Sequence, residues 1–269
     1  MEFCIYMQSI VSTELNLAYA GDYMKIFVYS KKGNGKNICE DVAMVAGTII
    51  SDSYYEMQAD QTYTAAIADG VGGNAGGDCA SRYVLDKLKD ISIADLSEEY
   101  LKQFIKGINE ELLHYAFQIP GKENMATTLT GVIATSDNGY IFHVGNTRVY
   151  GLQGNYLKQF TEDQTTYQWL INMGQIEAAE KCNKNEITHC LGGGNRQFGC
   201  NIFVKEINAL NICKRLLLTS DGIHEYVSVD ELEDFMVGET SERTMKLLVN
   251  KANTNGSLDD KTVIVIDRK

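Results

Sequence analysis

Several apolar runs of this chain border an aspartate, and this arrangement constrains the fold more than any other feature. The run 65–68 ends at Asp69, the run 216–220 leads to Asp221, and Asp259 stands shortly before a third run. Runs of this length are typical of buried strands. Carboxylates at the ends of strands can converge on one rim of a sheet sandwich, and rings of carboxylate and carbonyl oxygen select hard cations such as Mg²⁺ or Mn²⁺.

Segments rich in β-branched and aromatic residues recur along the chain, which is typical of strands. The turns Asp137-Asn138-Gly139 and Gln153-Gly154-Asn155 favour hairpins between neighbouring segments. We expect strands near 24–30, 42–50, 63–68, 127–135, 140–145, 147–152, 155–160, 201–207, 214–219 and 262–267.

Helical periodicity predicts helices over 80–91, from Ser97 to about 113, and over 240–253. Glu98 and Glu99 suit the first turn of the second helix, because acidic residues there complement the helix dipole. The irregular stretch 161–200 predicts a surface excursion with one short helix. Together these elements predict an α+β fold: a β-sandwich of two mainly antiparallel sheets flanked by helices on both outer faces, a four-layer αββα arrangement. We expect residues 1–269 to form one domain.

Composition excludes several classes of protein. The net charge of −12 argues against binding nucleic acid, which needs a basic face. The seven cysteines contain no CxxC pair, so they predict reduced thiols rather than disulfides or a zinc site. The N-terminus lacks a basic signal-peptide region, and the apolar stretch 42–50 is too short to cross a bilayer. We therefore expect a cytoplasmic protein with no membrane association.

The acidic segments also have simpler interpretations. Asp69-Gly70-Val71-Gly72-Gly73 could be only a tight turn, and it lacks the GxGxxG spacing of a dinucleotide loop. The pair Glu40-Asp41 alone could be a solvated patch. The recurrence of acids beside apolar runs favours metal binding over these readings.

Taken in their order along the chain, the short motifs resemble those of the metal-dependent protein phosphatases, also called PPM or type 2C serine/threonine phosphatases. The resemblance runs from about Lys36 to the end of the chain. The matching segments are Glu40-Asp41 for the first acidic pair, Asp69-Gly70-Val71-Gly72-Gly73 for DGxGG, Ala126-Thr127-Thr128-Leu129 for GTT, His143-Val144-Gly145-Asn146-Thr147-Arg148 for HVGDSR, Ser220-Asp221-Gly222 for SDG and Asp259-Asp260-Lys261-Thr262 for DNxT.

The resemblance implies a bacterial enzyme that hydrolyses phosphoserine and phosphothreonine on proteins. It implies two Mn²⁺ or Mg²⁺ ions that share Asp69, with a water between them attacking phosphorus directly. Catalytic roles are implied for Asp69, Asp221 and Lys36, of which Lys36 would bind the substrate phosphate. The implied metal-binding residues are Glu40, Asp41, Asp69, Gly70, Asp221 and Asp259. Implied partners are phosphorylated proteins and a cognate serine/threonine kinase.

Three residues depart from the family's pattern. Lys36 stands where the family usually has an arginine, so the bidentate grip on phosphate is lost. Asn146 replaces an aspartate that helps to hold a third ion, and we expect that third site to be weak or absent. Asp260 replaces a common asparagine and adds negative charge. Lys36 and Asn146 keep open the alternative of a weak or inactive member that binds phosphoproteins.

A second phosphatase motif lies in the same chain. His189-Cys190-Leu191-Gly192-Gly193-Gly194-Asn195-Arg196 matches HCxxGxxR, the phosphate loop of cysteine-based phosphatases, with Cys190 as nucleophile and Arg196 as phosphate ligand. Such a loop should follow a buried strand and open a helix, whereas polar residues precede this one and a strand-like run follows it. We therefore rank the cysteine mechanism below the metal mechanism.

Overall fold

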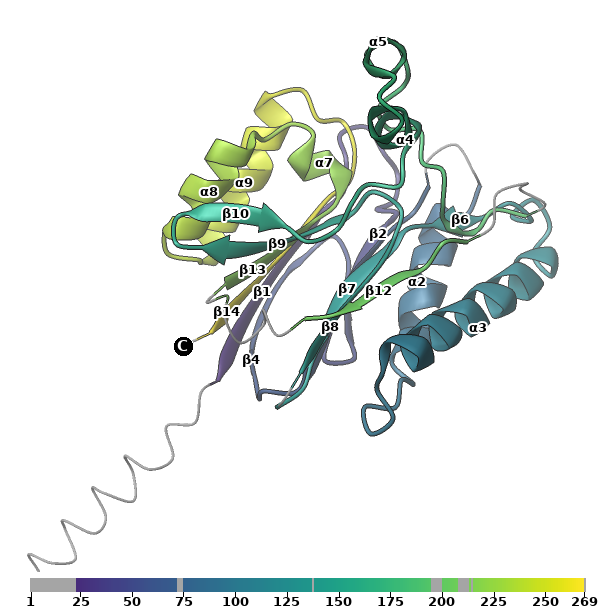
Figure 1. Cartoon of the computed structure of the whole chain (residues 1–269), viewed down its shortest axis with the longest axis horizontal. Helices are drawn as coiled ribbons and strands as arrows, with labels where there is room; N and C mark the ends of the chain where they lie inside the picture. Colours follow the sequence, from purple (N-terminus) through teal and green to yellow (C-terminus); the bar gives the residue numbers. More distant parts are fainter. Residues whose placement is uncertain are drawn as a thin grey trace, which may run out of the picture.

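The computed structural model describes residues 23–71, 75–136, 138–194, 200–207, 213 and 215–268. Two antiparallel sheets face each other, and helices cover the outer side of each (Figure 1). The four-layer α+β sandwich expected from the sequence is thereby confirmed. None of the helices in the described ranges has the length and apolar character needed to span a bilayer.

The first sheet contains both ends of the described chain at its centre. Its strand order is β10-β9-β13-β14-β1-β4. The strands are β1 (Met24–Lys31), β4 (Tyr54–Ala59), β9 (Arg148–Gln153), β10 (Tyr156–Gln159), β13 (Arg215–Thr219) and β14 (Lys261–Arg268).

The second sheet supplies the other half of the sandwich, in the order β12-β8-β7-β5-β2-β3. A short separate pair, β6 (Ala126–Thr127) with β11 (Leu191–Gly192), lies beside it. The strands of the second sheet are β2 (Asp41–Val45), β3 (Thr48–Ile50), β5 (Tyr63–Asp69), β7 (Leu129–Ala134), β8 (Gly139–Val144) and β12 (Phe203–Glu206).

The helices divide between the two outer faces. Those that pack on the second sheet are α2 (Gly77–Leu88) and α3 (Glu98–Phe117). Those on the first sheet are α7 (Asp221–His224), α8 (Val229–Val237) and α9 (Glu242–Thr254). The excursion after β10 carries α4 (Thr166–Asn172) and α5 (Ile176–Ala179), which project beyond one end of the sandwich (Figure 1).

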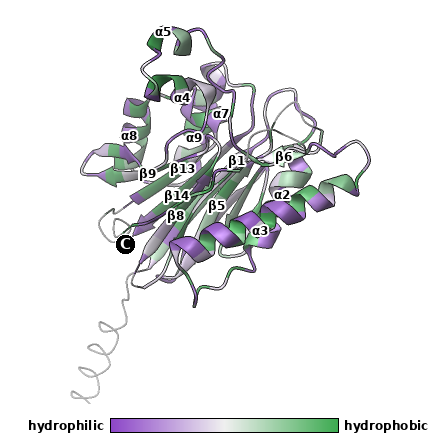
Figure 2. Cartoon of the chain, turned by 45° about the vertical axis from the view of Figure 1, so that its right-hand side comes forward, coloured by the Kyte–Doolittle hydropathy of each residue, from purple (hydrophilic) through white to green (hydrophobic). Residues whose placement is uncertain are grey.

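The main core lies between the two sheets. Side chains such as Ile26, Ile67 and Ile264 are fully buried there. Each fully buried aliphatic side chain contributes roughly 1.5–3 kcal/mol relative to an exposed one. Hydrophobic residues follow the strands, whereas α3 carries both hydrophobic and hydrophilic residues (Figure 2), as expected of a helix with one face on a sheet.

Some expected elements differ from the observed ones. The single strand expected over 42–50 is a hairpin of β2 and β3, because Ala46 and Gly47 turn the chain with positive φ angles of 45° and 79°. Helix α8 and strand β4 were missed, although Ser228 and Glu231 form a capping box that marks the start of α8. The turn expected at 137–139 lies partly outside the described residues.

Candidate active site

Asp41 and Asp69 face each other across two neighbouring strands. Asp41 opens β2 and Asp69 closes β5, and the antiparallel register makes them direct partners. Asp221 comes from the other sheet, as the first residue of α7 directly after β13. The two sheets therefore bring three of the expected site residues to one rim.

Asp69 is close enough to the other two acids to interact with both. The pKa of Asp69 is well above its ordinary value, first because of burial and then because of the negative charges of Asp41 and Asp221. Burial also raises the pKa of Asp41 and of Asp221. Asp259 adds to the repulsion that raises the pKa of Asp69 and Asp221, so it belongs to the same acidic rim.

Polar side chains orient these carboxylates. Ser220 Oγ donates to Asp41 Oδ2 at 2.7 Å and accepts from the Thr262 N–H at 2.9 Å. Asn146 Nδ2 donates to Asp221 Oδ2 at 3.0 Å. Ser220 has no assigned role in the sequence interpretation, although it precedes Asp221 in the motif. It connects the first and second sheets at the site.

Gly70 is required by close packing. A Cβ at this position would lie 2.6 Å from the carbonyl carbon of Gly77 and 2.9 Å from Cβ of Glu40. The Gly70 N–H donates to the Glu40 carbonyl at 3.2 Å, which holds the acidic pair beside the end of β5. Gly72 and Gly73 of the same motif lie outside the described residues.

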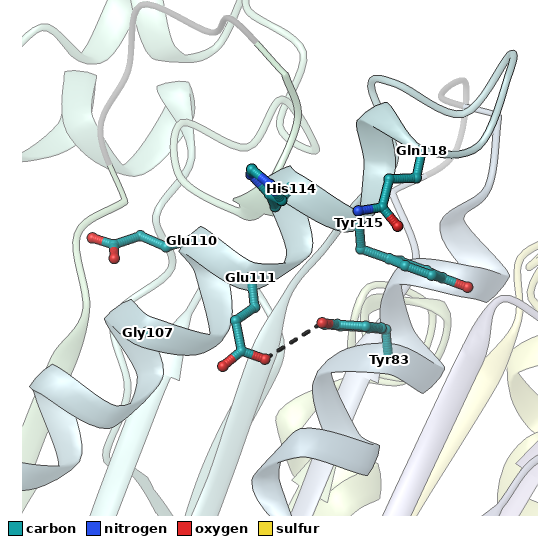
Figure 3. Close-up of a pocket in the computed structure, with 7 residues that line it drawn as sticks. All are labelled: Tyr83, Gly107, Glu110, Glu111, His114, Tyr115 and Gln118. Atoms are coloured by element: carbon teal, nitrogen blue, oxygen red, sulfur yellow. Dashed lines mark hydrogen bonds between the residues drawn. The ribbon is translucent and has the colours of Figure 1, made fainter.

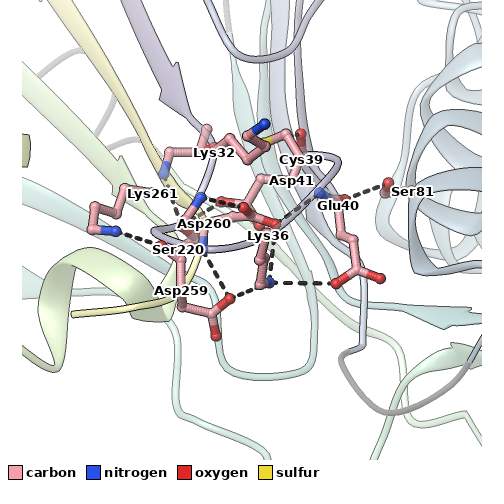
Figure 4. Close-up of polar contacts among 12 residues, drawn as sticks. Lys32, Lys36, Cys39, Glu40, Asp41, Ser81, Ser220, Asp259, Asp260 and Lys261 are labelled. Atoms are coloured by element: carbon pink, nitrogen blue, oxygen red, sulfur yellow. Dashed lines mark hydrogen bonds and ion pairs between the residues drawn. The ribbon is translucent and has the colours of Figure 1, made fainter.

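Lys36 is held by carboxylates at this rim. Its Nζ lies 2.5 Å from Asp259 Oδ1, 3.1 Å from Asp260 Oδ2 and 3.3 Å from Glu40 Oε2. Figure 4 shows these three carboxylates around the lysine. Burial alone would lower the pKa of Lys36, but hydrogen bonds and charge attraction from Asp259 and then Asp260 outweigh it and raise the pKa. Lys36 is therefore a protonated ammonium in this arrangement.

Asp260 has a larger structural role than the sequence indicated. It is 2% exposed, and its carboxylate accepts from the N–H groups of Gly33 and Glu40, each at 2.7 Å. Next to it, the fully buried Lys261 donates through Nζ to the carbonyl of Asp259. Asp260 thus fixes the loop that carries Lys36 and Glu40, a contact that a motif comparison cannot reveal.

The donor set fits a hard divalent cation. Asp41, Asp69 and Asp221 provide only oxygen, and burial together with repulsion from neighbouring carboxylates raises their pKa, so that a bound cation would stabilise their charged forms. As the side chains stand, no three Asp, Glu, His or Cys residues in the described part of the chain form a ready cage for one ion. Instead, Glu40 and Asp259 accept hydrogen bonds from Lys36. Asp41 accepts one from Ser220, and Asp221 accepts one from Asn146.

The cysteine motif does not open a helix in its described part. Cys190 is buried and leads directly into β11, which pairs with β6. The Gly192 N–H donates to Asn109 Oδ1 at 2.8 Å, and the Gly193 N–H donates to the Met125 carbonyl at 2.8 Å. These backbone donors therefore bind protein rather than surround a phosphate. Arg196 lies outside the described residues.

The excursion, expected to carry one short helix, carries two, α4 and α5, and it contacts the site region. Gln164 N donates to the Gly145 carbonyl at 2.8 Å, and the Gly145 N–H donates to Gln164 Oε1 at 3.0 Å. Farther along, Asn185 Nδ2 donates to Glu225 Oε2 at 2.5 Å. The excursion is thus attached both beside Asn146 and at the helix that Asp221 opens.

A surface cavity of about 500 Å³ lies elsewhere, between α2 and α3. Tyr83 and Glu111 face each other across it (Figure 3), and Tyr83 stacks on Tyr115 with ring centroids 4.6 Å apart. Its described lining contains none of the site acids. We therefore place the chemistry at the acidic rim and not in this cavity.

Comparison with known proteins agrees with this geometry. The sequence profile of the protein phosphatase 2C family matches residues 42–260. The serine/threonine phosphatase stp of Listeria welshimeri is 30% identical over 213 residues, which cover 75% of this chain and 83% of that protein. Protein phosphatase PhpP of Streptococcus pneumoniae is 30% identical over 229 residues, covering 80% of this chain and 89% of that protein.

Solved structures give the same result. Serine/threonine phosphatase Stp1 from Staphylococcus aureus superposes with a TM-score of 0.74 at 27% identity, covering 91% of this chain and 94% of that one. The Mycobacterium tuberculosis phosphatase PstP/Ppp superposes with a TM-score of 0.73 at 26% identity, covering 91% and 98%. The family resemblance inferred from the motifs is confirmed: the chain belongs to the protein phosphatase 2C family.

Proposed function

We propose that this chain is a serine/threonine protein phosphatase that uses two Mn²⁺ or Mg²⁺ ions. The observation that carries the proposal is the convergence of Asp41 and Asp69, paired across β2 and β5, with Asp221, which opens α7 after β13 of the other sheet. The bacterial relatives that match over most of this chain are named serine/threonine phosphatases, which supports the same activity. Phosphorylated proteins are the proposed substrates.

Asp69, Asp221, Asp259, Glu40 and the Gly70 carbonyl would hold the two ions. Asp41, held by Ser220, would contribute from the buried end of β2. When bound, such ions lower the pKa of coordinated water and neutralise charge on a phosphoryl group.

The other residues orient groups at the site. Lys36 would bind a phosphate oxygen as a point charge, because an ammonium lacks the two-pronged geometry of arginine. Asn146 donates its amide to Asp221, so it restrains that carboxylate rather than adding a third anionic ligand nearby. We infer that two ions, and not three, serve the reaction.

The contacts of Lys36 also favour a second candidate, a phosphoprotein-binding member with little turnover. Its ammonium is engaged by carboxylates, which would weaken its contact with substrate phosphate. Turnover of a phosphothreonine peptide with added Mn²⁺ separates the two candidates. A partner kinase, a cytoplasmic location and the one-domain organisation remain predictions.

The first experiment measures hydrolysis of p-nitrophenyl phosphate and a phosphothreonine peptide, with Mn²⁺ and then with excess EDTA. Activity that requires Mn²⁺ supports the proposal, and Cys190→Ser should then retain it. Activity that persists in EDTA and disappears in Cys190→Ser would instead support the cysteine mechanism. Metal binding without turnover would support the phosphoprotein-binding candidate.

A further inference from the structure

Lys36 does more at this rim than face a substrate phosphate. Its single ammonium lies within 3.3 Å of Glu40, Asp259 and Asp260. Two of these, Glu40 and Asp259, are proposed metal ligands, whereas Asp260 is occupied by backbone N–H groups. The ammonium therefore binds the same carboxylates that a cation would need.

The three contacts differ in how readily they can be exchanged. The Asp259 side chain is 47% exposed and the Glu40 side chain is 20% exposed, so both lie at the rim. The Asp260 side chain is 2% exposed and is fixed by the N–H groups of Gly33 and Glu40. Lys36 can thus leave the first two carboxylates and keep the third.

We propose that Lys36 is an internal counter-ion that competes with the divalent cation for Glu40 and Asp259. When a cation binds, the ammonium is released from these two carboxylates and stays on Asp260, from where it can reach a phosphate. Metal loading and the freeing of the phosphate-binding group are then one linked event. This inference rests on the proposed function, since it concerns the same metal site.

The chemistry of lysine suits this exchange. An ammonium has three donors on a flexible stem, so it can serve three separate carboxylates and then swing away. The loop that carries it turns at Gly35, whose φ is +84°. Lys261, the other lysine at the rim, instead donates to the backbone carbonyl of Asp259. Removing Lys36 should therefore remove a competitor and not a ligand.

The test is calorimetric titration of the full-length, metal-stripped protein with MnCl₂, comparing the wild type with Lys36→Met. We expect Lys36→Met to bind Mn²⁺ about tenfold more tightly, the equivalent of one charge-assisted hydrogen bond. Lys32→Met is the matched control: Lys32 lies on the same loop, and its Nζ donates to the Asn37 carbonyl rather than to a carboxylate. It should change the Mn²⁺ affinity by less than about twofold.

A second measurement covers the case in which Lys36→Met unfolds more easily. Without metal the variant should melt at a lower temperature than the wild type, because the acidic rim has lost its counter-ion. Mn²⁺ should raise its melting temperature by more than it raises that of the wild type. Equal Mn²⁺-induced shifts, or an unchanged or weaker affinity, would overturn the inference.

These outcomes are separable from a failure of the proposed function. If the wild type binds no Mn²⁺ and hydrolyses nothing, the metal mechanism itself is wrong. If the wild type binds Mn²⁺ and is active while Lys36→Met binds no more tightly, only the counter-ion role is wrong.

Discussion

Lys36 and Asp260 form an ion pair with an Nζ–Oδ2 distance of 3.1 Å, and both depart from the residues that their family usually carries. Lys36 occupies the position of an arginine, and Asp260 occupies the position of an asparagine. Because they are partners in space, the negative charge added by one is balanced by the ammonium of the other. The two departures therefore act as one structural unit and not as separate losses.

A double-mutant cycle tests this pairing. We expect Asp260→Asn alone to lower the free energy of unfolding in EDTA by about 1–3 kcal/mol, because a buried acceptor of two N–H groups and an ammonium is weakened. In the Lys36→Met background the same change should cost less, since the ammonium that pairs with Asp260 is already absent. Urea unfolding of the four proteins gives the coupling energy. Losses that add to within about 0.5 kcal/mol would contradict a coupled pair.

Removing one carboxylate from the acidic rim should lower activity but raise stability. Asp69→Asn should reduce Mn²⁺-dependent hydrolysis by more than roughly 100-fold. Loss of a residue that only orients a metal ligand typically costs roughly 10–100-fold, and Asp69 is a proposed ligand itself. In EDTA the same variant should be more stable than the wild type, because it removes the charge that Asp41 and Asp221 repel. Thermal unfolding and phosphopeptide hydrolysis measure the two effects.

Asp52→Asn is the matched control for that prediction. Asp52 forms an exposed ion pair with Lys31 at 3.0 Å, and its Oδ1 also accepts from the Lys32 N–H at 3.1 Å, an acceptor that asparagine retains. Exposed pairs contribute little, so we expect full activity and a stability change within about 0.5 kcal/mol. A loss of activity in Asp52→Asn equal to that in Asp69→Asn would point to a general charge effect.

Ser220 should control metal affinity through Asp41. Ser220→Ala removes the donor that orients this carboxylate, and we expect Mn²⁺ binding to weaken by roughly 10–100-fold. Ser257→Ala is a fitting comparison, because this buried hydroxyl donates at 2.9 Å to the Gly222 carbonyl instead of a carboxylate. Titration with Mn²⁺ should show weaker binding in Ser220→Ala than in Ser257→Ala. Similar Mn²⁺ affinities in the two variants would show that Ser220 acts only on folding.

Much of the fold is predictable from the sequence because its signals are local. The runs that become β1, β5 and β13 are dominated by β-branched, aliphatic or aromatic residues, and their burial matches that composition. The hairpin of β2 and β3 was not predicted, since Ala46 adopts φ 45° without being glycine. There the tertiary context overrides the local preference.

The site is predictable only in part. Asp69 closes β5 as expected, whereas Asp221, expected directly after a strand, opens α7 two residues after β13, and the fold brings both to one rim. The contact of Lys36 with Asp260 spans 224 positions of sequence, so no local pattern could indicate it. The role of Ser220 likewise depends on a partner in the opposite sheet. Long-range partners decide the electrostatics here.

Buried histidines predict loss of stability in acid. His143 bonds Thr130 Oγ1 at 2.8 Å and the Glu162 carbonyl at 3.0 Å, and burial lowers its pKa to about 4. Because the unfolded chain binds the proton from about pH 6.5 downward, stability should fall by about 1.4 kcal/mol per pH unit between about pH 6.5 and 4. His224, whose pKa burial also lowers, adds to this fall.

The measurement is the difference in unfolding free energy between the wild type and His143→Gln at several pH values. Taking the difference cancels the pH-dependent contributions of the acidic residues and of His224, because both proteins contain these groups. We expect the advantage of the wild type to shrink as the pH falls from 6.5 towards 4. A difference that stays constant over this range would show that His143 titrates normally in the folded protein.

Two glycine substitutions should have opposite effects on stability. A Cβ at Gly222 would lie 1.9 Å from the Asp260 carbonyl oxygen, so Gly222→Ala must move backbone beside Asp221. We expect it to lower the free energy of unfolding by at least about 1–3 kcal/mol and to reduce Mn²⁺-dependent hydrolysis. A Cβ at Gly107, within α3, has no other atom within 4 Å. Gly107→Ala should therefore stabilise the protein by roughly 0.5–1 kcal/mol and leave its activity unchanged, and urea unfolding that ranked the two variants in the reverse order would contradict the packing described for the rim.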